Sequence, residues 1–185
     1  MFLKKSVFFV FAFTLLVTGC NAKNDEVKEN DGLKTYATEI GSPNDGKKAP
    51  DFTLLTPGGK EVKLSDYEGK VILLDFWATW CPPCIKSVPD LIAIHNEFDG
   101  QAVVIGVSLD KETNTAKDVA PFIERFQINY PVVMGDKAVA NAYGGVEAIP
   151  TLFIIDQKGN IVNKHIGFSE KSKYVAEIKK LLGKS

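Results

Sequence analysis

The chain has 185 residues and a formal net charge of −1, and 45% of its residues are apolar. These values fit one folded domain after an N-terminal leader. A near-neutral charge gives no reason to expect nucleic-acid binding, and the single arginine, Arg125, argues against bidentate phosphate contacts. We therefore expect no nucleic-acid partner.

The first twenty residues are typical of an exported protein's leader. Lysines within residues 1–5 precede an apolar run, residues 7–17, that is too short to span a bilayer comfortably. The run ends in Val17-Thr18-Gly19-Cys20, which resembles a bacterial lipobox, although Val17 stands where leucine is commonest. We predict a lipoprotein signal peptide over residues 1–20, with a lipid on Cys20 that binds the membrane. An ordinary cleaved signal peptide with a chance cysteine is the alternative.

Residues 21–48 are rich in Asn, Asp, Glu, Lys and Gly and have little to bury, so we interpret them as a flexible tether. About 25 such residues reach roughly 25–30 Å. Export with a lipid places the chain outside the cytoplasm, anchored to a bacterial membrane, where disulfides persist. A dithiol kept reduced there needs an electron donor in the membrane.

Residues 49–185 form the predicted folded domain. Two short extended segments, residues 52–54 and 61–64, flank Pro57-Gly58-Gly59, which favours a hairpin. Nearly continuous apolar residues predict a buried central strand over residues 71–77. The patterns that follow predict helices over 84–98, 115–126 and 136–143, strands over 101–109, 130–133, 151–155 and 161–166, and a last helix from a Ser169 cap to about Leu182. This order predicts an α/β fold whose mixed sheet has helices on both faces.

Residues 71–84, VILLDFWATWCPPC, place two cysteines where the central strand meets a helix start. Unpaired amides and the helix dipole favour a thiolate at a helix N-terminus. Cys81 is therefore the candidate nucleophile, and Cys84 is the candidate resolving cysteine. A zinc site is disfavoured because Cys20 is the only other cysteine. We expect no metal, and no cofactor besides a redox-active Cys81–Cys84 disulfide.

This stretch resembles the thioredoxin superfamily, because WCPPC follows Asp75, six residues before Cys81, and precedes Pro89, eight residues after it. The hairpin pattern and about 20–25 extra residues near 113–133 are similar to the TlpA/ResA type of membrane-tethered thiol:disulfide oxidoreductase, although peroxiredoxins share that elaboration. The resemblance implies a thioredoxin-like fold with an N-terminal β-hairpin and an inserted helix and strand.

The resemblance also implies a substrate surface. In this superfamily a cis-proline at the position of Pro150 lies against the disulfide and leaves the preceding backbone free to pair with a substrate. A trans proline at the start of an ordinary strand is the alternative. The expected surface consists of Trp80, Ile149, Pro150, Thr151 and Gly167. Trp77 is expected in the core, and we interpret His95 and His165 as ordinary surface or edge residues.

Asp75 lies in the middle of the apolar strand, where burial raises the pKa of a carboxylate. It matches thioredoxin's buried aspartate, which implies that it takes and returns the Cys84 proton through water. A structural pair or a solvent-facing carboxylate is the alternative. Thioredoxin pairs its aspartate with a lysine, but residues 105–107 contain none, and Ser87 stands where ResA-type proteins often carry a glutamate. We therefore expect proton handling to depend on Asp75 alone.

Pro82 and Pro83 separate the two cysteines and bear on the redox potential. Prolines have no N–H, so two donors that normally stabilise a thiolate at a helix start are absent. A less stabilised dithiol is the better reductant. Our hypothesis is therefore a pair that donates electrons.

Three functions stay open on the sequence. The first is an oxidoreductase that reduces exported proteins, with apocytochrome c among the targets that the resemblance implies. Such a protein would act in cytochrome c maturation or cell redox homeostasis, as a monomer recharged by an integral-membrane thiol donor. The second is a peroxiredoxin-type peroxidase, but Leu74 stands where its motif has proline and only Arg125 could be its arginine. The third is a non-catalytic binding module with a structural disulfide.

Overall fold

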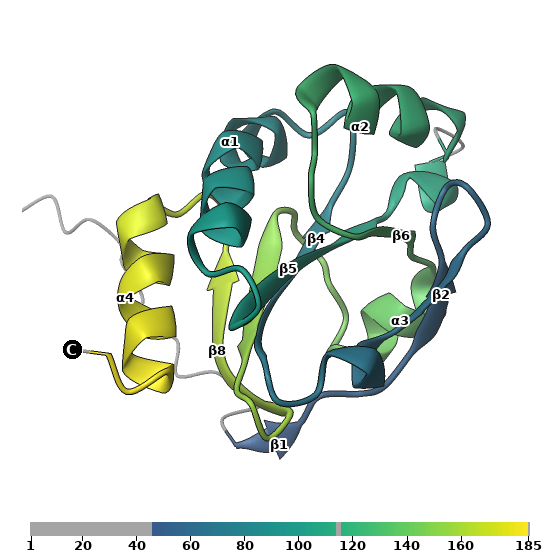
Figure 1. Ribbon diagram of the computed structural model, residues 1–185. Helices are drawn as coiled ribbons and strands as arrows, with labels where there is room; N and C mark the ends of the chain where they lie inside the picture. The colour runs from purple at the N-terminus through teal and green to yellow at the C-terminus, as the bar shows by residue number, and fades with distance from the viewer. Residues whose placement is uncertain (1–45, 114–115, 185) are drawn as a thin grey trace, which may run out of the picture. The chain divides into compact units, whose positions relative to one another are not determined.

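The computed structural model describes residues 46–113 and 116–184, which fold as in Figure 1. The predicted signal peptide with Cys20, and the predicted tether up to residue 45, lie outside these ranges. Within them, no helix has both the length and the apolar character needed to cross a membrane.

A six-stranded mixed sheet forms the centre, in the order β1-β8-β7-β4-β5-β6. Its strands are β1 (Lys47–Lys48), β4 (Val71–Trp77), β5 (Ala102–Ser108), β6 (Val132–Met134), β7 (Thr151–Ile155) and β8 (Asn160–Ile166). β4, β5 and β6 run parallel, whereas β7, β8 and β1 are antiparallel to their neighbours. Every residue of β4 is buried, which confirms the predicted central strand.

Helices cover both faces of the sheet, as predicted (Figure 1). One face is covered by α1 (Pro82–Glu97), α2 (Val119–Phe126) and α4 (Lys171–Leu181). The other is covered by α3 (Lys137–Ala142), the 3-10 turn η1 (Leu64–Tyr67), and the hairpin of β2 (Thr53–Leu55) and β3 (Glu61–Lys63). The hairpin therefore forms where the sequence predicts it.

The two faces matter because successive side chains of β4 point to opposite sides. Leu73 and Trp77 pack in the cluster beneath α1, whereas Leu74 and Phe76 pack in the cluster on the other face. By the same alternation, Asp75 points to the α1 face. The strand thus places its one carboxylate on the side of the sheet that carries the cysteines.

Several boundaries differ from the predicted ones. The predicted tether includes Lys47–Lys48, but these residues form β1, because the edge of β8 offers backbone partners whatever the side chains. Helix α1 begins at Pro82 rather than Cys84, since a proline at the first helical position loses no hydrogen bond. The helix predicted over 115–126 is divided into the turn η3 (Ala116–Asp118), which follows η2 (Asp110–Thr113), and α2.

The predicted Ser169 cap is wrong. Glu170 is the N-cap residue of α4, and its side chain makes no capping hydrogen bond. A packed helix can begin without a side-chain cap because tertiary contacts supply most of its stability.

Candidate active site

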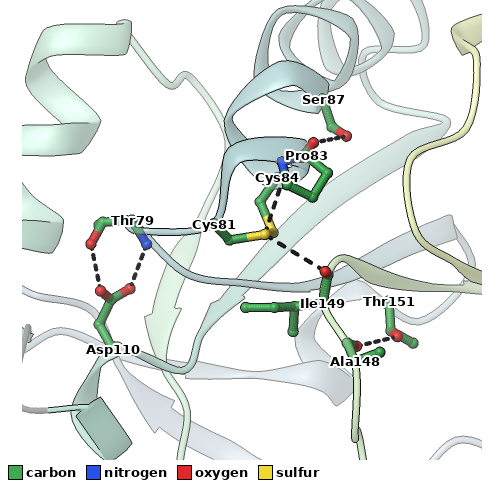
Figure 2. The surroundings of a disulfide bond; sticks show 9 residues. All are labelled: Thr79, Cys81, Pro83, Cys84, Ser87, Asp110, Ala148, Ile149 and Thr151. Atoms are coloured by element: carbon green, nitrogen blue, oxygen red, sulfur yellow. Dashed lines mark hydrogen bonds between the residues drawn. A yellow bond between two sulfur atoms is a disulfide. The ribbon is translucent and has the colours of Figure 1, made fainter.

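Cys81 and Cys84 form a disulfide at the start of α1 (Figure 2). Cys81 is the N-cap residue of this helix, and the Cys84 amide donates to Cys81 Sγ over 3.3 Å. Both residues are almost completely buried, with 3% of the surface of Cys81 and 1% of the surface of Cys84 exposed. The candidate nucleophile therefore lies at the helix N-terminus, as predicted, and its partner lies one turn inside the helix.

The two prolines occupy the first two helical positions and are exposed. Neither has an N–H, so Cys84 is the first helical residue that can donate an amide hydrogen bond. That amide is directed at Cys81 Sγ. Of the three amides that a helix start would normally present near this sulfur, one is left.

A loop before β7 brings a second segment against the disulfide. The Ile149–Pro150 peptide bond is cis, as predicted. Cys81 Sγ lies 3.6 Å from the carbonyl oxygen of Ile149 (Figure 2). The Gly167 amide donates to the Pro150 carbonyl over 2.7 Å, and Gly167 has a φ of +81°, a conformation that favours glycine. Ile149 therefore lies beside Cys81, and Gly167 is hydrogen-bonded to the same loop through Pro150.

Thr151 does not fit the predicted substrate surface through its side chain. It is 1% exposed, and its hydroxyl donates to the Ala148 carbonyl over 2.7 Å (Figure 2). Its place in β7 directs the side chain inward, so it holds the loop before Pro150 rather than facing a partner.

Trp80 has the exposure expected of a docking residue, with 51% of its surface accessible. Together with Ile149 it lines an open cavity of about 480 Å³ that extends toward α3. The apolar part of the lining is completed by Leu109, Ala140 and Val146. Trp77, in contrast, is 2% exposed and belongs to the core, as predicted.

Asp75 is 4% exposed, and burial raises its pKa to about 7. The predicted burial of Asp75 is therefore confirmed. Its neighbour across the strands is Gly106 of β5, and a Cβ there would lie 2.8 Å from Trp77 Nε1. The indole thus fills the space that a lysine side chain would need. This explains physically why no cation accompanies Asp75 on that strand.

The charge of Asp75 is also felt by two buried tyrosines. The pKa values of Tyr130 and Tyr174 are raised, first by burial and then by the nearby Asp75 carboxylate. Ser87, where ResA-type proteins often carry a glutamate, is buried, and its hydroxyl donates to the Pro83 carbonyl over 3.1 Å. This position therefore adds a helix contact and no second carboxylate.

A polar cluster that the sequence pattern does not predict lies next to the cysteines. Asp110, fully buried after β5, accepts hydrogen bonds from the Thr79 amide over 3.0 Å, the Thr79 hydroxyl over 2.5 Å and the Ser108 hydroxyl over 2.9 Å. Figure 2 shows the Thr79 contacts beside the disulfide. The only sequence signal is an aspartate directly after a buried strand, and no spacing rule links it to Thr79.

The remaining candidates lie in ordinary structural contacts. His165 pairs with Glu177 at 2.9 Å, and His95 Nδ1 accepts from the Val104 amide at 3.4 Å. Arg125 is exposed on α2, with its guanidinium carbon 5.4 Å from the centre of the Phe126 ring. Each of the three side chains thus has a structural contact that explains its position, and no role in catalysis needs to be assigned to it.

A cysteine pair at a helix start lies directly against a cis-proline loop, in a fold built on a mixed sheet of this order. This combination defines a thioredoxin-like thiol:disulfide exchange protein. Sequence comparison gives the same class. The chain matches the AhpC/TSA family over residues 46–164. It is 31% identical over 173 residues to the thiol-disulfide oxidoreductase ResA of Bacillus thuringiensis subsp. konkukian, covering 93% of this chain and 95% of that protein.

Solved structures agree. A protein of Chlorobium tepidum described as the thiol:disulfide interchange protein DsbE has 36% identity and a TM-score of 0.66, over 76% of this chain and 98% of that one. The exposed lipoprotein thioredoxin of Streptococcus pneumoniae has 32% identity and a TM-score of 0.63, over 71% and 99%. The chain belongs to the AhpC/TSA family of thioredoxin-like proteins, among the ResA-type members. It is a thiol:disulfide oxidoreductase.

Proposed function

We propose that this oxidoreductase is a reductant that works outside the cytoplasm and gives electrons to the disulfides of exported proteins. The observation that carries the direction is the start of α1, where Pro82 and Pro83 leave the Cys84 amide as the first helical donor to Cys81 Sγ. A thiolate with few donors is weakly stabilised, so the dithiol form gives up its electrons more readily.

The exchange takes two steps that together transfer two electrons. The Cys81 thiolate attacks one sulfur of the substrate disulfide, and the other substrate sulfur leaves as a thiolate. Cys84 then loses its proton and attacks Cys81 Sγ, which releases the second substrate thiolate and closes the Cys81–Cys84 disulfide. The substrate ends as a dithiol, and its thiolates take their protons from water.

Asp75 is the proposed acceptor of the Cys84 proton. Its pKa of about 7 allows it to take a proton and return it to water near neutral pH. It lies on the α1 face of β4, the side of the sheet that holds both cysteines. The remaining site residues are assigned to binding: Trp80, Ile149 and Gly167, which are exposed or half-buried, form the surface that receives the substrate chain, and the buried cis-Pro150 holds the loop beneath it.

We further propose that a lipid on Cys20 anchors the protein to a bacterial membrane, with residues 21–45 as the tether. The lipobox-like sequence supports this, and one structural relative is itself described as an exposed lipoprotein. An integral-membrane thiol protein would re-reduce the Cys81–Cys84 disulfide. Exported polypeptides with disulfides, apocytochrome c among them, are the proposed substrates of a monomeric enzyme that needs no other cofactor.

The direction of electron flow is tested by equilibrating the protein with glutathione buffers and measuring the oxidised fraction. We expect a reduction potential nearer to about −270 mV, as in thioredoxin, than to about −120 mV, as in strong oxidants. A value at the oxidising end would contradict the proposed direction.

The substrates are identified by expressing the Cys84→Ala variant in the native host. Without the resolving thiol, a mixed disulfide on Cys81 persists and holds its partner. We expect exported proteins in the trapped set. A set confined to cytoplasmic proteins would contradict the proposed location.

A further inference from the structure

We infer that Asp110 is a positioning residue for disulfide exchange, because it clamps Thr79 and thereby holds Trp80 and Cys81 in place for a polypeptide substrate. The inference concerns the exchange reaction itself, so it holds whichever direction electrons flow. Asp110 is the first residue of η2, two residues past the end of β5; it lies 31 residues from Thr79 in the sequence and is fully buried.

The clamp is built on the parallel ladder of β4 and β5. That ladder continues past the paired residues, because the Leu109 amide donates to the Trp77 carbonyl over 2.8 Å. The next residue, Asp110, is thereby brought level with Thr79. One carboxylate oxygen accepts the Thr79 amide at 3.0 Å and the Ser108 hydroxyl at 2.9 Å, and the other accepts the Thr79 hydroxyl at 2.5 Å.

These bonds reach the reacting sulfur through a short chain of covalent and hydrogen bonds. Thr79 is followed directly by Trp80 and Cys81, and the Cys81 amide donates back to the Ala78 carbonyl over 3.2 Å. A movement of Thr79 would therefore move the exposed indole of Trp80 and the Cys81 backbone together. It would also break hydrogen bonds to a buried carboxylate, which are among the stronger ones in proteins.

Positioning matters more for a polypeptide than for a small disulfide. A polypeptide docked against Trp80 and Ile149 must present its disulfide along one line of approach to Cys81 Sγ. A misplacement of about 1 Å can then lower the rate by up to about 10²-fold. A small disulfide contacts few surface groups, so it can reorient freely until one of its sulfurs is aligned with Cys81 Sγ. The clamp should therefore affect the two substrates differently.

The test uses Thr79→Val, which removes the hydroxyl donor and keeps the shape of the side chain. Reduced full-length protein is mixed with insulin or with 2-hydroxyethyl disulfide, and Cys81 oxidation is followed by rapid alkylation and mass spectrometry. We expect the rate with insulin to fall about tenfold and the rate with the small disulfide to stay within about twofold. Asp110→Asn should act in the same direction, because its amide nitrogen replaces one acceptor oxygen.

Two variants make the comparison specific. Thr79→Ser keeps both donors to Asp110 and should restore the insulin rate to within about twofold of the unmodified protein. Tyr143→Phe removes a similarly buried hydrogen bond, from the Tyr143 hydroxyl to the Pro50 carbonyl at 2.8 Å, on the other face of the sheet. It should leave both rates unchanged, so it controls for a general loss of stability.

The pH profile of Cys81 alkylation separates positioning from a change in the thiol itself. Thr79→Val leaves every charge in place, so the midpoint of this profile should not move. The inference would be overturned if Thr79→Val leaves the insulin rate unchanged, lowers both rates equally, shifts the midpoint, or behaves like Tyr143→Phe.

Discussion

At the scale of single residues, Asp75 carries an electrostatic cost that depends on pH. Its side chain is 4% exposed, and burial raises its pKa to about 7 from an ordinary value of 3.8. The folded protein therefore holds a proton that the unfolded chain releases between about pH 4 and pH 7. The contribution of protonated Asp75 to the free energy of unfolding is fully present below about pH 4 and is lost as the pH rises through about 7.

Asp75→Asn should remove this part of the pH dependence, because an amide stays neutral. We expect the variant to match the unmodified protein near pH 4 and to be more stable above pH 7. The difference should be on the order of a few kcal/mol, at about 1.4 kcal/mol per pKa unit. Urea unfolding of both oxidised proteins from pH 4 to pH 8 measures it. Parallel curves would show that Asp75 does not ionise in this range.

The same variant tests the role of Asp75 in exchange. Without a proton acceptor, Cys84 should attack the mixed disulfide about 10²-fold more slowly at pH 7, while the first attack by Cys81 is little changed. Rapid quenching with a thiol-alkylating reagent should show accumulation of the mixed disulfide. Above about pH 9 hydroxide can deprotonate Cys84, so the defect should shrink. A defect that stays constant with pH would contradict this role.

At the scale of elements, the first turn of α1 sets the environment of Cys81. Two prolines separate the N-cap residue Cys81 from the Cys84 amide. Fewer backbone N–H groups at the helix N-terminus can therefore donate to the Cys81 sulfur and stabilise its thiolate. The helix keeps its first turn because proline suits the first helical position. Thiolate stabilisation can therefore be changed without changing the fold.

Pro83→Ala should restore one amide donor near Cys81 Sγ. The added donor stabilises the thiolate, so we expect a lower Cys81 pKa and a more oxidising potential. Alkylation rates against pH measure the pKa, and glutathione equilibria measure the potential. Ser87→Ala, which alters the same helix by removing a bond to the Pro83 carbonyl, serves as the control and should change neither quantity much. An unchanged potential in Pro83→Ala would contradict the donor argument.

Local patterns could predict the elements, because their signals lie within a few residues. The apolar run of β4, the hairpin glycines and the C-x-x-C spacing each define one element, and each is found as predicted. The Asp110–Thr79 contact could not be predicted in this way, since it depends on the register of β4 against β5. The two-lysine strand β1 was missed because its pairing depends on the edge of β8.

The direction of a side chain was equally hard to predict. Thr151 adjoins Pro150 in the sequence, which suggests a place on the substrate surface. The strand alternation of β7 instead turns its hydroxyl toward the Ala148 carbonyl. A family resemblance can therefore predict which segment lies at the site. The alternation of side chains along the strand determines which atoms of that segment are accessible to a substrate.

At the scale of the whole molecule, the sheet separates redox chemistry from a second core. The disulfide, Trp77 and the helices α1, α2 and α4 share one apolar cluster. The opposite cluster contains the packed rings of Phe76, Tyr143 and Phe153, and it includes none of the proposed catalytic groups. Core substitutions on either face should consequently lower the free energy of unfolding by similar amounts. Only substitutions on the face with the disulfide should also change the redox site.

Two leucines test this separation, because each is buried in the sheet on a different face. Leu152 of β7 lies opposite Asp75 in the strand pairing and is 2% exposed, whereas Leu74 of β4 points to the other cluster and is 0% exposed. Each change to alanine should lower the free energy of unfolding by about 2–5 kcal/mol. Only Leu152→Ala should admit water beside Asp75 and thereby lower its pKa toward 3.8.

The measured quantity is the difference in unfolding free energy between pH 5 and pH 8. It should be smaller in Leu152→Ala than in the unmodified protein, since a carboxylate that meets water costs less to ionise. Leu74→Ala should keep the full difference despite a similar loss of stability. The contrary outcome is an equally reduced difference in unfolding free energy between pH 5 and pH 8 in both variants. The pKa of Asp75 would then depend on the overall packing of the molecule, and not on the side chains that cover Asp75 on one face of the sheet.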